Sequence, residues 1–282
     1  MSALDRALAG LTATSAAGLG FSRLVALVNE PNMPSGGGAT VRRVLQLAPV
    51  RGDLPLIEVG SNTGYTTIEM ASWVTAPVIG VDVDPVSCAF ATAKAARHGI
   101  GNARFVVGDG LALPVADASC QLVFCSNVTS FMRDHDRASR EYYRVLAPRG
   151  VLAAVPIHYH REPPSALRAR VEEAIRAPLP VTSRDYWVDV FAHPRSTLIA
   201  EETYEYERRS DDDVEAYVKG VMAQPHLDAV APSVRSALAE RLTHFYRLFD
   251  ENLSYARYSI LLFRADHPNP EPVLHTSHRV AT

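Results

Sequence analysis

The stretch Leu54-Pro-Leu-Ile-Glu58-Val-Gly60-Ser-Asn-Thr-Gly64-Tyr65 decides the fold of this chain. An apolar run ends there in a carboxylate and a glycine-punctuated turn, and a helical pattern follows over residues 66–74, which is typical of a strand, a loop and a helix. In an open parallel sheet, ligands bind at the carboxyl ends of such strands. The two glycines let the backbone approach a ligand closely, and Glu58 places a negative charge beside that space. We therefore expect a bound amine or sulfonium there rather than a pyrophosphate.

Two further apolar segments end in acids. Residues 77–82 read as a second strand that ends in Asp82, and residues 103–108 read as a third strand followed by Asp109. An acid roughly 20 residues beyond the first strand and turn is where such a sheet holds a ribose, because a carboxylate accepts two charge-assisted hydrogen bonds from the hydroxyl pair. Glu58, Asp82 and Asp109 form an ordered series of strand-end acids, which predicts a ligand that contains a ribose.

Two common nucleotide-binding motifs are absent from the first turn. The dinucleotide fingerprint needs glycines at the spacing G-x-G-x-x-G, but from Gly60 the second and third positions are Asn62 and Tyr65. No Gly-Lys-Ser/Thr follows the turn, which excludes a Walker-type phosphate loop. These departures argue against NAD and against nucleoside triphosphates.

With these motifs the chain resembles the class I S-adenosylmethionine-dependent methyltransferases, strongly over residues 50–160 and loosely to about 265. That family has Glu/Asp-x-Gly-x-Gly-x-Gly in the first turn, and here Asn62, the non-glycine residue most tolerant of a left-handed backbone, replaces the middle glycine. The resemblance implies S-adenosyl-L-methionine as cofactor. The cofactor contacts that it implies are Glu58, Gly60, Ser61, Asn62 and Gly64 around the aminoacyl and sulfonium portion, Tyr65 beside it, Asp82 and Val83 at the ribose, Asp109, Gly110 and Leu111 at the adenine, and Asn127 after strand four.

The family pattern extends through the rest of the chain. Residues 120–127 resemble strand four, residues 140–150 a helix and a Leu-x-Pro-x-Gly turn, and residues 151–157 strand five, while residues 197–206 and 255–264 read as the last two strands. We predict an α/β fold: a doubly wound, mostly parallel seven-stranded sheet with helices on both faces. The expected division is an N-terminal helical cap (1–48), a Rossmann-like domain (49–265) with a helical insertion at about 208–252, and a flexible tail (266–282).

Composition narrows the classes of partner and location. The chain has 282 residues, a formal net charge of -3, and 28 basic against 31 acidic residues. It has no basic stripe, so no nucleic-acid partner is expected. Three cysteines without ligand spacing predict a reducing compartment and no metal. No apolar run reaches the roughly 20 residues of a membrane span, and no signal peptide is evident. We expect a cytoplasmic protein that acts on a small molecule, either alone or as a homo-oligomer.

The segment after strand five carries the candidates for acid–base work. His158 or His160 could take a proton near neutral pH, and Tyr159 could orient an acceptor. His158 is expected to be the best placed, since it is nearest to the strand end. The alternatives are rings that face solvent without a role and, less favoured, a metal held by the two histidines. Because the sulfonium is an excellent leaving group, a base is needed only when the acceptor must lose a proton.

The sequence therefore predicts methyl transfer to a small metabolite. Asn127 is followed by Val-Thr-Ser, not by the Pro-Pro-aromatic sequence of DNA-base methylation, and the arginine-over-lysine bias suggests a high-GC bacterium and specialised metabolism. Two alternatives stay open: a family member with the same cofactor and another chemistry, such as cyclisation, and a non-catalytic cofactor-binding subunit. The glycine-rich segment 30–38 is either a simple turn between helices or a mobile cover over the site.

Overall fold

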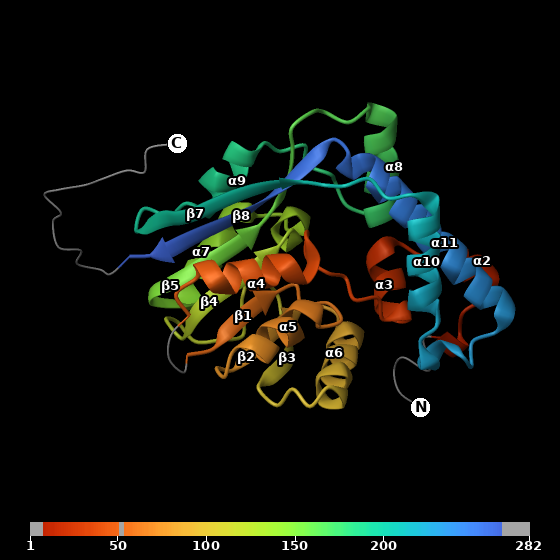
Figure 1. The fold of residues 1–282 in the computed structure, drawn as a ribbon, viewed down its shortest axis with the longest axis horizontal. Helices are drawn as coiled ribbons and strands as arrows, with labels where there is room; N and C mark the ends of the chain where they lie inside the picture. Colours follow the sequence, from red (N-terminus) through yellow and green to blue (C-terminus); the bar gives the residue numbers. More distant parts are fainter. Residues whose placement is uncertain (1–7, 51–53, 267–282) are drawn as a thin grey trace, which may run out of the picture.

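A mixed sheet of eight strands forms the centre of the protein. The structure, a computed structural model, describes residues 8–50 and 54–266. The strands run in the order β3 (Ala103–Val107), β2 (Val78–Asp82), β1 (Leu56–Val59), β4 (Cys120–Ser126), β5 (Leu146–Val155), β8 (Ala256–Ala265) and β6 (Ile157–Tyr159), and β7 (Ser196–Glu205) also pairs with β8 (Figure 1). The first five strands are parallel to their neighbours, and β8 is antiparallel to β5, β6 and β7. The predicted fold class is confirmed.

The eighth strand arises because Pro156 interrupts strand five. On its two sides, β5 and β6 both pair with β8, and the Pro156 carbonyl accepts a hydrogen bond of 3.2 Å from the Ser259 N–H. Proline has no N–H to give to the ladder, so the segment predicted as one strand divides in two. The predicted Leu-x-Pro-x-Gly turn lies within β5 as a bulge, since Leu146 pairs with Cys120 and Val151 with Leu122.

Helices cover both faces of the sheet, as buried parallel strands require. On one face Leu56 and Leu122 pack with α4 (Gly37–Leu47) and α5 (Tyr65–Trp73). On the other face Ile57 and Val123 pack with α7 (His135–Val145) and α9 (Arg184–Phe191). Next to β2 and β3 lies α6 (Pro85–Arg97), which Asp84 caps through the backbone N–H groups of residues 86 and 87. Neighbouring residues of one strand thus enter two separate cores.

A third core lies beside the sheet and consists only of helices. It joins α2 (Ala13–Ala17), α3 (Phe21–Val28), α8 (Ser165–Ile175), α10 (Asp211–Met222) and α11 (Pro232–Leu253), with the short η2 (Pro225–Leu227) between the last two (Figure 1). Its most buried members include Leu24, Leu238 and Phe245. Two helices, α10 and α11, lie between β7 and β8, where the helical insertion was predicted, and they pack against the N-terminal helices. Residues 267–282 of the predicted tail lie outside the described residues. Within the described ranges, no helix is long and apolar enough to cross a membrane.

Candidate functional site at the carboxyl end of the sheet

The turn after β1 has the left-handed backbone that its residues favour. Gly60 has φ +77°, Asn62 has φ 43° and Gly64 has φ +88°. A Cβ at Gly60 would lie 2.5 Å from Val128, and one at Gly64 would lie 2.6 Å from the Cβ of Ala91. The two glycines are therefore needed for close packing of the protein itself. Asn62 adopts the left-handed backbone that asparagine tolerates better than other non-glycine residues.

Asp82, at the end of β2, is bonded to this turn. Its Oδ2 accepts a 2.8 Å hydrogen bond from the Asn62 N–H, and its Oδ1 accepts one of 2.9 Å from the Asp84 N–H. Burial raises the pKa of Asp82 above its ordinary value. Each carboxylate oxygen has a further lone pair, so the group can still accept hydrogen bonds from a ligand. The neighbouring Val83 is 69% exposed and offers an apolar surface beside it.

Glu58 lies beneath the turn and does not face open space. Its side chain is buried, and Thr67 of α5 donates its hydroxyl hydrogen to Oε2. Burial raises the pKa of Glu58 to about 7, against the lowering effect of the Thr67 and Thr66 hydroxyls. A positive charge nearby would favour the ionised form. The carboxylate is therefore poised to respond to a cationic ligand.

The remaining predicted contacts lie around the same edge. Asp109 accepts a 2.9 Å hydrogen bond from the Leu111 N–H, and a Cβ at Gly110 would lie 2.9 Å from Val59 at the end of β1. Asn127 has φ 53° and precedes the single turn η1 (Val128–Phe131). All of these residues follow parallel strands, so they lie at one edge of the sheet.

Ser61 provides a test of whether this edge fits S-adenosylmethionine. The residue is 3% exposed, and its hydroxyl has no hydrogen-bond partner among the described residues. Buried polar groups are ordinarily paired, so an unpaired hydroxyl within the turn indicates a place where a polar ligand binds. Together with the carboxylates of Glu58 and Asp82, which accept hydrogen bonds, this set of polar groups fits a ligand that has an amine, a sulfonium and ribose hydroxyls.

The segment of residues 29–36, which joins α3 to α4, contacts the glycine turn. The Thr63 hydroxyl donates a 2.6 Å hydrogen bond to the Glu30 carbonyl, and Tyr217 of α10 donates to the Glu30 carboxylate. Burial raises the pKa of Glu30 and lowers that of Lys94, which lies 3.4 Å from the Thr63 hydroxyl, to about 8. Tyr65 reaches the backbone of Gly38 at the start of α4. The segment thus joins two helices and is also anchored to the glycine turn.

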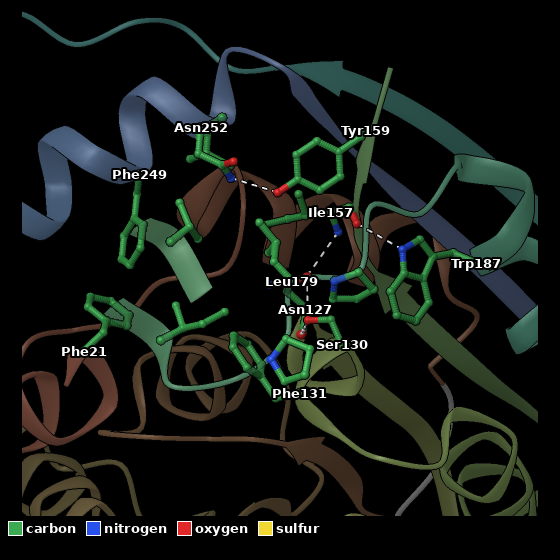
Figure 2. A pocket seen from close by; sticks show the side chains of 15 residues that line it. Phe21, Asn127, Ser130, Phe131, Ile157, Tyr159, Leu179, Trp187, Phe249 and Asn252 are labelled. Carbon is green, nitrogen blue, oxygen red and sulfur yellow. Dashed lines mark hydrogen bonds between the residues drawn. The ribbon is translucent and has the colours of Figure 1, made fainter. Parts of the chain in front are cut away.

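A cavity of about 190 Å³ opens next to Asn127. Figure 2 shows side chains from distant parts of the chain pointing into it, with no charged residue among the described lining. Its polar lining consists of Asn127, Ser130, Tyr159 and Asn252, and its apolar lining includes Phe21, Phe131, Leu179, Trp187 and Phe249. The Asn252 amide donates a 2.8 Å hydrogen bond to the Tyr159 hydroxyl, and the Trp187 ring N–H donates one of 3.0 Å to the Ile157 carbonyl. Such a cavity suits an uncharged, largely apolar molecule.

Of the three predicted acid–base candidates, only Tyr159 lines this cavity. Side chains alternate along β6, so Ile157 and Tyr159 face the cavity while His158 points to the other side, where its Nε2 lies 2.9 Å from the Ser259 hydroxyl. Burial lowers the pKa of His158 to about 4, and His160 is exposed beyond the strand. The expectation that His158 is the best placed base is not met by this geometry. Among the described residues, no three histidine, cysteine or acidic side chains are grouped as metal ligands.

Several cavity residues carry no local sequence signal. Trp187 comes from α9, and Phe249 and Asn252 come from α11. They meet Tyr159 only because α9 and α11 pack against the same end of the sheet. Burial raises the pKa of Tyr159 above its ordinary value, which keeps its hydroxyl protonated near neutral pH.

Comparison with known sequences relates the chain to methyltransferases. Residues 57–154, from β1 to β5, match the family model described as a methyltransferase domain. Trans-aconitate 2-methyltransferase of Azoarcus sp. (strain BH72) is 28% identical over 200 residues, which are 67% of this chain and 76% of that protein. Demethylmenaquinone methyltransferase of Thermus thermophilus is 34% identical over 114 residues, which are 40% of this chain and 46% of that protein. The first relative is thus matched over most of its length and the second over about half.

Solved structures match a larger share of this chain than these sequence relatives do. The MccD protein superposes with a TM-score of 0.67 at 22% identity, covering 83% of this chain and 100% of that one. The [4+2]-cyclase SpnF superposes with a TM-score of 0.61 at 19% identity, covering 81% of this chain and 80% of that one. At these identities the likeness establishes the fold, and the reaction has to be argued from the site.

Proposed function

Because this chain belongs to the class I S-adenosylmethionine-dependent methyltransferases, we propose that it methylates an uncharged, largely apolar small molecule held beside Tyr159. The observation that carries the proposal is the cavity next to Asn127, whose described lining is aromatic and aliphatic with four neutral polar residues. A carboxylate or a phosphate acceptor would lose its hydration there without gaining a cationic partner.

For the cofactor, we propose that the residues around the glycine turn act together. Glu58 and the turn from Gly60 to Gly64 would surround the aminoacyl and sulfonium end, Asp82 with Val83 the ribose, and Asp109 to Leu111 the adenine. When bound, S-adenosylmethionine supplies an activated methyl group on a sulfonium. The buried Ser61 hydroxyl and the remaining lone pairs of Asp82 support this placement.

For the acceptor, the role we propose for the protein is orientation. No aspartate, glutamate, histidine, lysine or cysteine is among the described residues that line the cavity, and Tyr159 holds its proton near neutral pH. Holding two reactants in line can supply about 7–11 kcal/mol of the barrier reduction. In our proposal, Tyr159 orients the acceptor by a hydrogen bond. The carbon–sulfur bond of the methyl donor breaks as the acceptor bonds to the methyl carbon, and the acceptor's proton is released to solvent rather than to a protein base inside the cavity.

A labelled-methyl assay tests this function directly. The protein is incubated with methyl-labelled S-adenosylmethionine and a panel of uncharged bicyclic alcohols and amines, next to carboxylates of the same size. We expect label in the uncharged products together with an equal amount of S-adenosylhomocysteine. Transfer confined to the carboxylates would contradict the proposal. Asp82→Ala is the matched inactive control, since it changes the cofactor site and leaves the cavity lining intact.

A second candidate function keeps the cofactor and changes the reaction. It is favoured by the structural likeness to a protein described as a [4+2]-cyclase and by the lack of a base among the described cavity residues. In that case the substrate is converted without formation of S-adenosylhomocysteine. The ratio of S-adenosylhomocysteine to product separates the two candidates: a ratio of one supports methyl transfer, and a ratio near zero supports the alternative.

As the biological setting, we propose bacterial specialised metabolism in the cytoplasm. The composition supports it, since Lys94 and Lys219 are the only lysines among 28 basic residues, as in proteins from high-GC bacteria. Comparing the metabolites of a bacterium with and without the gene tests the proposal. Loss of one methylated secondary product without a growth defect is the expected result.

A further inference from the structure

Asn252 is the most deeply buried of the polar residues that line the cavity. It lies in the last turn of α11 and is 5% exposed. Its Nδ2 donates the 2.8 Å hydrogen bond to the Tyr159 hydroxyl, whereas its Oδ1 has no partner among the described residues. A buried carbonyl without a donor is unfavourable and uncommon in folded proteins. Its presence in the wall of a cavity indicates that a ligand supplies the donor.

Tyr159 offers the complementary function. Its oxygen already accepts from Asn252, and within the described part of the chain no group accepts the phenolic proton. Because burial raises its pKa, this proton stays in place near neutral pH. The two side chains thus present one free hydrogen-bond donor and one free acceptor side by side in a wall whose other described polar residues are Asn127 and Ser130 (Figure 2).

We propose that Tyr159 and Asn252 form a recognition pair for a hydroxyl group on the acceptor molecule. A hydroxyl donates to the Asn252 carbonyl and accepts from the Tyr159 phenol at the same time. An ether can only accept, and a carboxylate would face the Asn252 carbonyl as a second acceptor. This inference rests on the proposed function and narrows its substrate class to hydroxyl-bearing apolar molecules.

Calorimetry with a matched pair of probes tests the inference. The probes are 5-indanol and 5-methoxyindane, which share a bicyclic apolar body and differ in that a methyl group replaces the hydroxyl proton. Both are titrated into the full chain saturated with S-adenosylhomocysteine, so that no turnover occurs. We expect wild type to bind 5-indanol about tenfold more tightly than 5-methoxyindane, which is the discrimination typical of one buried hydrogen bond.

The variants assign the preference to the pair. Asn252→Leu should weaken the binding of 5-indanol and bring the ratio of the two affinities close to one. Tyr159→Phe, which removes one oxygen atom, should have the same effect, and it serves as the test if Asn252→Leu does not fold. Ile175→Ala is the matched control, since Ile175 lines the cavity without a polar atom: it should weaken both probes equally and preserve the ratio.

The outcomes separate this inference from the proposed function. If both probes bind wild type equally, or if both variants keep the tenfold ratio, the recognition pair is refuted while the apolar cavity stands. If neither probe binds, the cavity is not the acceptor site, and the proposed function is overturned together with the pair.

Discussion

The carboxylate of Asp82 accepts a 2.8 Å hydrogen bond from the backbone N–H of Asn62. The end of β2 therefore fixes the glycine turn that follows β1, and the same carboxylate is the one we assign to the ribose. Asp82→Ala should lower the affinity for S-adenosylmethionine by roughly 2–4 kcal/mol, because two charge-assisted hydrogen bonds to the ligand are lost. Calorimetric titration measures the change.

Asp84 provides the control for Asp82. It caps α6 through the N–H groups of Val86 and Ser87, and its side-chain hydrogen bonds within the described residues all go to α6 rather than to the glycine turn. Asp84→Ala should lower the free energy of unfolding by about 1 kcal/mol, the usual effect of losing a helix cap, and keep cofactor affinity. Equal losses of cofactor affinity in the two variants would mean that Asp82 acts only through local stability.

The pH dependence of binding should report the ionisation of Glu58. Burial raises its pKa to about 7, so its contribution to stability is present below the ordinary pKa and is lost as pH rises through about 7. The sulfonium favours the ionised carboxylate. Affinity for S-adenosylmethionine should therefore increase between about pH 6 and pH 8, and affinity for the product, which keeps the ammonium but has a neutral sulfur, should increase less.

Glu58→Gln isolates this effect from other groups. Lys94, with a pKa of about 8, titrates in the same region but is unchanged in the variant. We expect the pH dependence for S-adenosylmethionine to flatten and its affinity to fall more than that of the product. An unchanged pH profile in Glu58→Gln would assign the effect to another group.

His158 should contribute to acid sensitivity rather than to turnover. Its pKa is lowered from 6.5 to about 4 by burial, so the folded state holds it neutral and its contribution to stability is lost as pH falls through 6.5 towards 4. His158→Gln removes this titration. The free energy of unfolding, measured with urea, should differ less between mildly acidic and neutral pH for the variant than for wild type. Its kcat should fall far less than the ~10²–10⁴-fold expected for loss of a general base; a loss of that size would restore His158 as the base.

Gly60 should be intolerant of a side chain. At φ +77°, with Val128 2.5 Å from the position of a Cβ, Gly60→Ala should destabilise the fold by about 1–3 kcal/mol and displace the turn. Gly220 lies in α10, has no atom within 4 Å of its Cβ position, and serves as control. Gly220→Ala should stabilise the protein by about 0.5–1 kcal/mol. Thermal unfolding of both variants compares the two effects, and equal melting temperatures would contradict the packing argument.

The placement of the strand-end acids at one edge of the sheet could be predicted from sequence because its signals are local. Glu58 lies near the end of β1, Asp82 ends β2 and Asp109 follows β3, and parallel strands bring their carboxyl ends to one edge without further information. Asn62 adopts the left-handed backbone for which its residue type is suited. Helix α10 begins at Asp211, close to the predicted start of the helical insertion at about residue 208, for the same reason: Ser210, which caps it, lies within the same segment.

The cavity beside Asn127 could not be predicted in the same way. Which face His158 takes depends on the pairing of β6 with β8 beyond Pro156, and a shift of one residue exchanges the faces. Trp187 and Asn252 reach the cavity through packing between elements far apart in sequence, which no local pattern encodes. Tryptophan is common in cores and asparagine on surfaces, so neither residue type alone marked these two positions as cavity residues.

The pairing of β8 has a consequence for how the protein is made. This strand joins β5, β6 and β7 in one sheet, yet residues 256–265 are synthesised after all of its partners. While residues 160–255 emerge from the ribosome, the edge of β5 stays unpaired, and exposed strand edges invite association with other chains. The strands β1 to β4 can therefore pair as soon as they are made, whereas β5 keeps one edge unpaired until β8 has emerged.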